Sequence, residues 1–280
     1  AWQSGDYAYT WQGNGMLSSV TRPDGKTVTF RYDALGRRIE KVFDGRVYRY
    51  LWDGDVILHE WDYAEADRPN TVVTETGEVT LDRPEPVENL ITWVYDSDSY
   101  VPTAKIVGDT HYSIISDYIG RPVQVYDDNG NIVWQADYDI YGNLRNLNGS
   151  RQFIPFRQSG QYEDEETGLY YNRFRYYDPR IGNYISQDPI RLGGGMSLYA
   201  YVHDTNSWID LLGLSGMPKG GWNYGNMPKL DGYQLHHVIP KSMAEHPAIK
   251  AAGFDVNKPS NLIYLPIEDG SHTTRSIHNG

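Results

Sequence analysis

Cysteine is absent from the sequence, which excludes a disulfide framework and any metal site built on thiolates. Long apolar runs are missing too, and none approaches the roughly 18 residues that a membrane-spanning helix needs. Positive charge is scarce, with 25 Lys and Arg against 37 Asp and Glu. The 280 residues are enough for one large or two modest hydrophobic cores.

The charge is distributed unevenly along the chain. Residues 215–280 hold six basic and five acidic residues, a net charge of +1. Because the whole chain carries −12, residues 1–214 carry a net charge of −13. Affinity for duplex nucleic acid comes mostly from cations that contact phosphates. The acidic part is therefore a poor nucleic-acid binder, whereas the charge of the last part neither favours nor excludes such a partner.

Aromatic residues are abundant, with 24 Tyr and 8 Trp, and they occur in a repeated pattern. The segment VTFRYDALGRRIEKVF has an alternating stretch, Tyr32-Asp33, a turn at Gly36-Arg37 and a second alternating stretch. The same order recurs in ISDYIGRPVQVYDDNGNIVWQADYDIYGNLRN. A period of two is typical of strands, and Asp-Gly and Asn-Gly pairs are typical of hairpin turns. We predict consecutive antiparallel hairpins in which each tyrosine covers a hairpin face and each aspartate caps a turn.

These repeats resemble the YD repeats of Rhs proteins, which form a hollow β-sheet shell in that family. Residues 160–214, GQYEDEETGLYYNRFRYYDPRIGNYISQDPIRLGGGMSLYAYVHDTNSWIDLLGL, are similar nearly position by position to the Rhs core-associated segment. In the family this segment plugs the shell and a variable toxin follows it. Departures from its pattern are Arg191 for a usual Gly, His203-Asp204-Thr205-Asn206 for Asn-Pro, and Leu211 for Pro.

The resemblance implies a mainly β protein with a small α+β domain at its end. We expect a YD-repeat β shell over residues 1–159, the core-associated segment over residues 160–214 and a toxin domain over residues 215–280. The first residues, AWQSGDYAYT, read as the middle of a repeat. We therefore expect the chain to be a fragment, with the rest of the shell upstream.

Two aspartates in the core-associated segment, Asp188 and Asp210, precede the Leu214-Ser215 bond. Rhs proteins cut themselves after the corresponding motif with paired aspartates that act like an aspartic protease. The resemblance implies that one carboxylate activates water while its protonated partner polarises the Leu214 carbonyl, because two close carboxyls have split pKa values. From residue types alone, both aspartates would instead be assigned to turn caps. Arg191 is a weaker candidate, as an ion-pair partner of one carboxylate.

Histidine is scarce until late: three lie in the first 235 residues and five between His236 and His278. A Gly-, Pro- and Asn-rich stretch after Leu214 predicts little regular structure. The segments LHHVIPKS, NKPSNLIYLP and SHTTRSIHNG follow. A bare His-His pair is more often structural than functional, but this order resembles the AHH group of HNH-type ββα-metal nucleases, with Leu235 in place of the alanine.

That resemblance implies roles for several residues. His236 would bind a divalent ion, His237 would be the general base that activates water against a phosphodiester, and Asn261 would orient that base. The sequence does not distinguish Mg, Zn or Ni.

Further ligands are expected from a helix after Asn261. His278 fits the first of two histidines spaced four apart, and the second would fall beyond Gly280, so the metal site is incomplete in the sequence as given. His272 is a weaker ligand candidate and Arg275 a weaker phosphate contact. A loop histidine and a solvated cation are their simpler interpretations.

The leading hypothesis is an Rhs toxin fragment whose shell releases a nuclease with DNA favoured over RNA as its substrate. The resemblance implies synthesis in a bacterial cytoplasm, secretion by type VI or another route into a target cell, and a cognate immunity protein. One alternative is a scaffold with an inactive passenger and self-cleavage as its sole chemistry. The other is a carbohydrate-binding surface protein, which rests on aromatic abundance alone.

Overall fold

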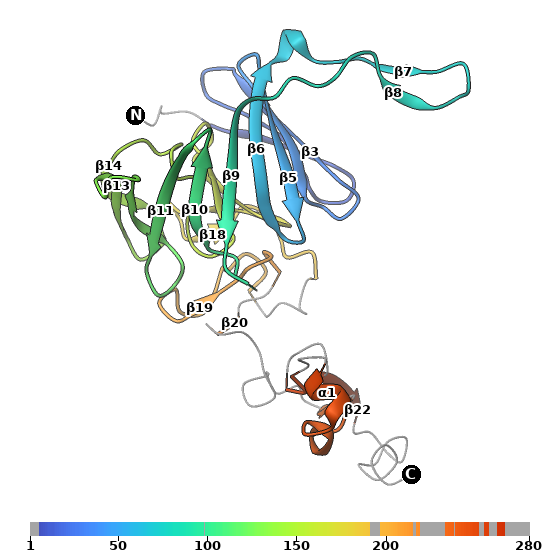
Figure 1. Ribbon diagram of the computed structural model, residues 1–280, viewed down its shortest axis with the longest axis vertical. Coiled ribbons are helices and arrows are strands. Elements are labelled where there is room, and N and C mark those ends of the chain that lie inside the picture. The colour runs from blue at the N-terminus through green and yellow to red at the C-terminus, as the bar shows by residue number, and fades with distance from the viewer. Residues whose placement is uncertain are drawn as a thin grey trace. The chain divides into compact units, whose positions relative to one another are not determined.

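The computed structural model describes residues 6–97, 99–190 and 197–214, followed by residues 217–218, 233–237, 239–251, 255–257 and 262–266. The chain divides into two compact units, Ala1–Gly216 and Met217–Gly280 (Figure 1). Among the helices in these ranges, none is long and apolar enough to span a membrane.

One antiparallel sheet of twelve strands dominates the first unit (Figure 1). Its strands lie side by side in sequence order, apart from an excursion between β6 and β9, so the predicted consecutive hairpins are confirmed. The strands are β1 (Ala8–Trp11), β2 (Leu17–Thr21), β3 (Thr27–Tyr32), β4 (Arg38–Phe43), β5 (Arg46–Asp53), β6 (Val56–Ala64), β9 (Glu88–Tyr95), β10 (Pro102–Val107), β11 (Thr110–Ser116), β12 (Pro122–Tyr126), β13 (Ile132–Tyr138) and β14 (Leu144–Asn148).

The excursion between β6 and β9 contains a 3-10 turn (Glu65–Asp67) and the short hairpin of β7 (Thr71–Val73) and β8 (Val79–Leu81). Figure 1 shows this hairpin projecting away from the sheet. The base of the excursion is tied to the sheet by Arg68, whose Nη1 lies 2.9 Å from an oxygen of Glu40.

The aspartates of the Tyr-Asp pairs cap the hairpin turns, as predicted. Asp33 Oδ1 accepts hydrogen bonds from the backbone N–H groups two and four residues later, at 2.9 and 2.8 Å. Asp127 and Asp139 repeat this arrangement, and so does Asp117, which follows Ser116 instead of a tyrosine. A glycine three residues after each aspartate has a positive φ, between 73° and 87°, which side chains with a Cβ rarely adopt. The repeat is thus one turn geometry used four times.

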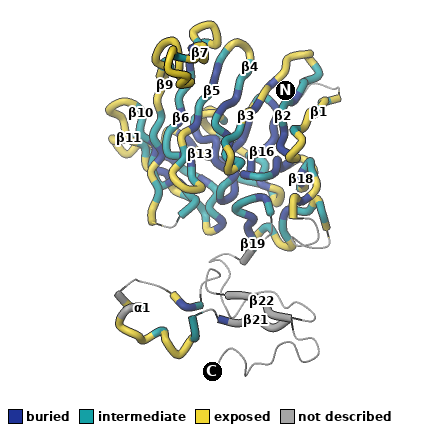
Figure 2. Tube along the Cα trace, turned by 90° about the vertical axis from the view of Figure 1, so that its right-hand side faces the viewer, coloured by how far each residue is buried: buried dark blue, intermediate teal, exposed yellow. Residues whose placement is uncertain are grey.

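A second, four-stranded sheet packs with the large sheet in one core. It consists of β15 (Tyr162–Asp164), β16 (Leu169–Asn172), β17 (Arg175–Asp178) and β18 (Asn183–Tyr184). Three of its tyrosines and the preceding Phe156 share a hydrophobic cluster with Trp93 and Trp134 of the large sheet, and its other tyrosines form a second cluster with Tyr201. Buried residues gather along the strands and exposed ones at the turns (Figure 2). The short strand β19 (Trp208–Ile209) follows later in this unit.

Buried charges also connect the two sheets. Arg38 and Asp164 are both fully buried, and Arg38 Nη1 lies 2.5 Å from Asp164 Oδ2. The Arg38 guanidinium also lies within 5.4 Å of the ring centres of Tyr50, Tyr162 and Tyr171. A buried cation needs such partners, because removal from water is costly.

The second unit contains an antiparallel pair, β21 (Tyr233–His237) and β22 (Leu262–Pro266), with His237 opposite Leu262. Between them lie a 3-10 turn (Lys241–Met243) and the short helix α1 (Pro247–Ala251). Strand β20 (Met217–Pro218) precedes them. Together with the first unit, this arrangement matches the predicted fold class.

Candidate functional site

Asp188 and Asp210 meet at one arginine. Arg175 Nη2 lies 3.2 Å from Asp188 Oδ2 and 3.1 Å from Asp210 Oδ2. Both carboxylates are buried, with 5% and 1% of their surface exposed. The structure thus brings to one arginine the two aspartates, 22 residues apart, that the family resemblance names as a pair.

Three strands of the small sheet place the groups around this pair. Asn172 ends β16 and Arg175 begins β17, directly opposite it in the register. Tyr184 ends β18 and lies opposite Tyr177 of β17. Asp188 follows β18, and its backbone N–H donates to the carbonyl of Leu198 at 2.9 Å. The groups around the pair are therefore held on paired strands, which fix side chains more firmly than loops do, whereas both aspartates lie outside strands.

Asp210 receives three hydrogen bonds besides its contact with Arg175. The Tyr184 hydroxyl donates to Oδ2 at 2.9 Å, and the backbone N–H of Leu214 donates to Oδ1 at 3.0 Å. Asn172 Nδ2 donates to the backbone carbonyl of Asp210 at 2.8 Å. Asp210 thus touches the backbone of the residue whose carbonyl forms the predicted scissile bond.

The environment of Asp188 favours its protonated form. Burial raises the pKa of its carboxyl, the Ile190 N–H and Arg175 oppose that rise, and the Asp210 charge adds to it. Its Oδ1 accepts the Ile190 N–H at 2.9 Å. A carboxyl with a raised pKa beside a second carboxylate is the usual setting for acid-base catalysis by a pair.

Hydrogen bonds join the segment that precedes the predicted cleavage point to the turn between β16 and β17. The Leu212 carbonyl accepts from the Phe174 N–H at 3.2 Å, and the Gly213 carbonyl accepts from Arg175 Nε at 2.5 Å. Gly213 has a φ of +67°, and a Cβ there would lie 2.4 Å from the Asn172 carbonyl oxygen. Only glycine fits so close a backbone approach.

Sequence reasoning missed Arg175 and Tyr184. The predicted arginine, Arg191, lies outside the described residues. Arg175 is one of several arginines in the segment, and Arg173 pairs with Asp55 and Arg180 with Asp178. No spacing rule distinguishes these three before the strands are paired.

In the second unit, His237 is buried and its Nε2 lies 3.1 Å from Asn257 Oδ1. A carbonyl oxygen only accepts, so this contact is a hydrogen bond in the tautomer that carries its proton on Nε2, and that tautomer has its lone pair on Nδ1, as a general base needs. Sequence reasoning also missed Asn257. His236 is placed in β21. The other predicted site residues, Asn261, His272, Arg275, His278 and Ser215, lie outside the described residues.

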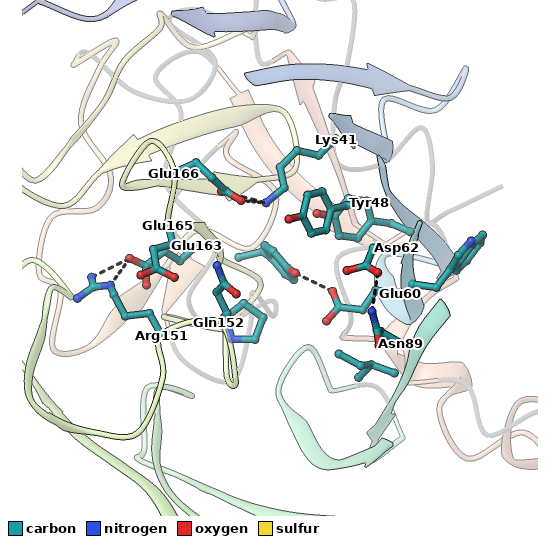
Figure 3. Close-up of a pocket in the computed structure, with 15 residues that line it drawn as sticks. Lys41, Tyr48, Glu60, Asp62, Asn89, Arg151, Gln152, Glu163, Glu165 and Glu166 are labelled. Carbon is teal, nitrogen blue, oxygen red and sulfur yellow. Dashed lines mark hydrogen bonds and ion pairs between the residues drawn. The ribbon is translucent and has the colours of Figure 1, made fainter. Parts of the chain in front are cut away.

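A pocket of about 140 Å³ lies between the large sheet and residues 151–166 (Figure 3). Figure 3 shows three of its carboxylates turned to partners: Glu166 to Lys41, Asp62 to Asn89 and Glu163 to Arg151. Glu60 accepts a hydrogen bond from the Tyr162 hydroxyl at 2.7 Å. The pocket contains neither aspartate of the pair. Within the described ranges, no three His, Asp or Glu side chains are grouped so as to hold a metal ion.

Comparison with known families identifies both parts of the chain. The family model described as the Teneurin YD-shell matches residues 1–192. The chain belongs to the YD-shell family. A second model, a nuclease family of the HNH/ENDO VII superfamily with conserved AHH, matches residues 217–280. The predicted Rhs-type YD shell followed by an AHH nuclease domain is therefore confirmed.

Curated relatives of this YD-shell protein carry different toxin names. Double-stranded DNA deaminase toxin A of Burkholderia cenocepacia is 32% identical over 80% of this chain, which spans 16% of that protein. Probable deoxyribonuclease RhsB of Dickeya dadantii is 34% identical over 76% of this chain, which spans 14% of it. The tRNA nuclease WapA of Bacillus subtilis is 29% identical over 78% of this chain, which spans 8% of it. The chain thus corresponds to a small part of these relatives.

Solved structures share the fold of the YD-shell protein. The crystal structure of TcdB2-TccC3-TEV matches with a TM-score of 0.55 at 22% identity, over 74% of this chain and 10% of that one. The structure of TcdB2-TccC3 without the hypervariable C-terminal region matches equally well, at 21% identity. These likenesses confirm the shell architecture.

Proposed function

We propose that this chain is part of an Rhs-type toxin: a β shell encloses an AHH nuclease and frees it by cutting its own chain after Leu214. The observation that carries the proposal is the meeting of Asp188 and Asp210 at Arg175, with the Leu214 N–H bound to Asp210. The proposed boundaries are residues 1–159, 160–214 and 215–280.

Self-cleavage would be a hydrolysis shared between two carboxyls. An ionised carboxylate takes a proton from water as its oxygen adds to the Leu214 carbonyl carbon, and the protonated partner donates to the carbonyl oxygen. The bond to the Ser215 nitrogen then breaks and that nitrogen takes a proton. The products are a Leu214 carboxylate and a Ser215 amine. Arg175 and Asn172 hold the carboxylates and the Asp210 backbone in place.

For the nuclease we propose His237 as general base, oriented through Nε2 by Asn257, and His236 as a metal ligand. A divalent ion, which HNH-superfamily nucleases generally use, would stabilise charge on the phosphate and on the leaving oxygen. The described part of the second unit supplies no complete ligand set. Asn261 and His278 stay predicted members of the site, and His272 and Arg275 weaker ones.

The proposed substrate is nucleic acid, with DNA favoured. A relative named as a deoxyribonuclease supports DNA as the substrate, and a relative named as a tRNA nuclease supports RNA. We further propose delivery into competing bacteria, by type VI secretion or another route, and an immunity protein in the producer. The relative named Toxin protein Tse5 of Pseudomonas aeruginosa supports a toxin role.

The nuclease is tested by incubating the full chain with supercoiled plasmid and, separately, with tRNA. We expect nicking that needs a divalent ion and stops with EDTA. His237→Ala should lower the rate by at least about 100-fold, as expected for the loss of a general base. His246→Ala is the matched control, because His246 is exposed in the same unit. Equal activity in both variants would contradict the role of His237, and no activity in the wild type would favour the passive-passenger alternative.

A further inference from the structure

We propose that Tyr184 is a positioning residue of the self-cleavage centre: its phenol holds the Asp210 carboxylate ionised and in place, and Asp188 is left as the carboxyl that carries the proton. This inference rests on the self-cleavage proposed above and assigns the two aspartates to different roles.

Tyr184 touches three members of the centre at once. Its hydroxyl donates to Asp210 Oδ2 at 2.9 Å and accepts from Asn172 Nδ2 at 2.6 Å. Its ring lies under the Arg175 guanidinium, 3.7 Å from ring centre to Cζ. Because Asn172 Nδ2 also donates to the backbone carbonyl of Asp210, one amide fixes both the phenol and the backbone that carries the carboxylate. Because the phenol oxygen accepts from Asn172, its own proton points toward Asp210.

The two carboxylates receive unequal numbers of donors. Asp210 accepts from Arg175 Nη2, the Tyr184 hydroxyl and the Leu214 N–H. Asp188 forms an ion pair with Arg175 Nη2 and accepts one hydrogen bond, from the Ile190 N–H. Hydrogen bonds to a carboxylate favour its charged form. The phenol is a donor that Asp188 lacks, so Tyr184 makes Asp210 the better anion and Asp188 the better acid.

The surroundings keep the phenol itself neutral. Burial raises the pKa of Tyr184 well above its usual value, the charge of Asp210 and the neighbouring Tyr201 add to this, and Arg175 opposes it. The other ring packed on it is Tyr177, with ring centres 5.9 Å apart. A phenol that stays protonated across the working pH range remains a donor throughout that range.

These contacts imply a direction for the reaction. Ionised Asp210 takes the proton from the attacking water, and Asp188 donates its proton to the Leu214 carbonyl oxygen. Without the phenol, Asp210 holds its own proton to a higher pH and competes with Asp188 for the acid role. The cleavage rate should then fall. On the plot of cleavage rate against pH, the decline on the acid side (the low-pH limb) should move to higher pH.

The test compares cleavage time courses of the full chain made by short pulses of cell-free synthesis and transferred to buffers between about pH 5 and 9. We expect Tyr184→Phe to slow cleavage by about 10- to 100-fold, the worth of one hydrogen bond to a charged group, with the low-pH limb shifted upward. Tyr177→Phe is the matched control, since this buried phenol in the same cluster donates to the Tyr141 carbonyl at 2.8 Å and not to an aspartate. It should cut at close to the wild-type rate with the wild-type pH dependence.

The outcomes separate the two proposals. If the wild type is never cut, the proposed self-cleavage is wrong. If the wild type is cut and Asp210→Asn is not, but Tyr184→Phe follows the wild-type rate and pH profile, only the role of Tyr184 is wrong. If Tyr184→Phe does not fold, Asn172→Ala decides, because it keeps the phenol and removes its orienting donor: slowed cleavage with a shifted limb supports the role, and a wild-type profile overturns it.

Discussion

Three buried arginines, Arg38, Arg157 and Arg175, each hold carboxylates that are themselves buried. Arg38 binds Asp164, Arg157 binds Glu163, and Arg175 binds Asp188 and Asp210. Breaking a buried pair on one side leaves an uncompensated charge, which costs more than the intact pair contributes. The Arg38 pair joins residues 126 apart in the sequence, the Arg157 pair is local, with its members six residues apart, and Arg175 brings Asp188 and Asp210 together.

Arg38→Met should lower the free energy of unfolding of the first unit by about 3 to 5 kcal/mol, because it leaves Asp164 buried with only the more distant Lys41 as a cation. The measurement is the denaturant midpoint, followed by tryptophan fluorescence. Arg37→Met is the control: Arg37 pairs with Asp33 within one partly exposed turn and should cost no more than about 1 kcal/mol. Equal losses in the two variants would show that Arg38 is not a special anchor.

At the scale of elements, one hairpin turn serves in two settings. Each of the turns at Gly120 and Gly130 has its own capping aspartate and a glycine with a positive φ. A Cβ at Gly130 would meet no atom within 4 Å, whereas Gly120 packs against Ser159, which directly precedes the core-associated segment. The same turn thus only reverses the chain direction at Gly130, whereas at Gly120 it is also packed against neighbouring residues.

Gly120→Ala should destabilise more than Gly130→Ala. Both substitutions place a Cβ in the left-handed region, which costs about 1 to 2 kcal/mol. A Cβ at Gly120 would also lie 2.3 Å from Ser159 Oγ and 2.6 Å from Val101 Cγ2, whereas one at Gly130 meets nothing within 4 Å. Overpacking adds about 1 to 3 kcal/mol. Thermal unfolding of the two variants measures the difference, and a smaller loss at Gly120 would contradict the packing seen there.

Much of this fold could be predicted from the sequence because its information is local. The turn at Asp33 is specified within five residues, and the alternation of the flanking strands lies beside it. The core-associated segment added the pairing of Asp188 with Asp210 through its resemblance to a family. Contacts between distant residues could not be predicted in this way: Arg38 and Asp164 lie 126 residues apart, and both are residue types that usually face water.

The family resemblance named the candidate residues Asp188, Asp210 and His237, but nothing in the sequence named the residues that contact them. Arg175, Tyr184 and Asn172 converge only after β16, β17 and β18 pair, and nothing in their spacing indicates that convergence. Likewise, Asn257 approaches His237 from a separate loop. Such residues contact the site because of where the fold places them. A sequence motif therefore does not identify them.

At the scale of the whole chain, the predicted cleavage point falls just after a segment that is firmly held. Residues 172–175 bind backbone carbonyls up to Gly213, and Asp210 binds the Leu214 N–H. Tyrosines of β16 and β17 contact the large sheet: Tyr171 Oη accepts from the Arg38 N–H, and Tyr176 Oη lies 2.8 Å from Tyr32 Oη. If the chain is cut there, the segment before the cut should stay with the sheet, and the domain after it should have no covalent link to the shell.

The intact mass of the purified chain under denaturing conditions tests this account most directly, for the wild type, Asp210→Asn and the control Asp178→Asn. Asp178 is a buried carboxylate of the same sheet that pairs with Arg180 instead. The account predicts two pieces divided between Leu214 and Ser215 in the wild type and the control, and one uncut chain in Asp210→Asn. A single uncut species in the wild type, or the same cut in Asp210→Asn, would contradict it.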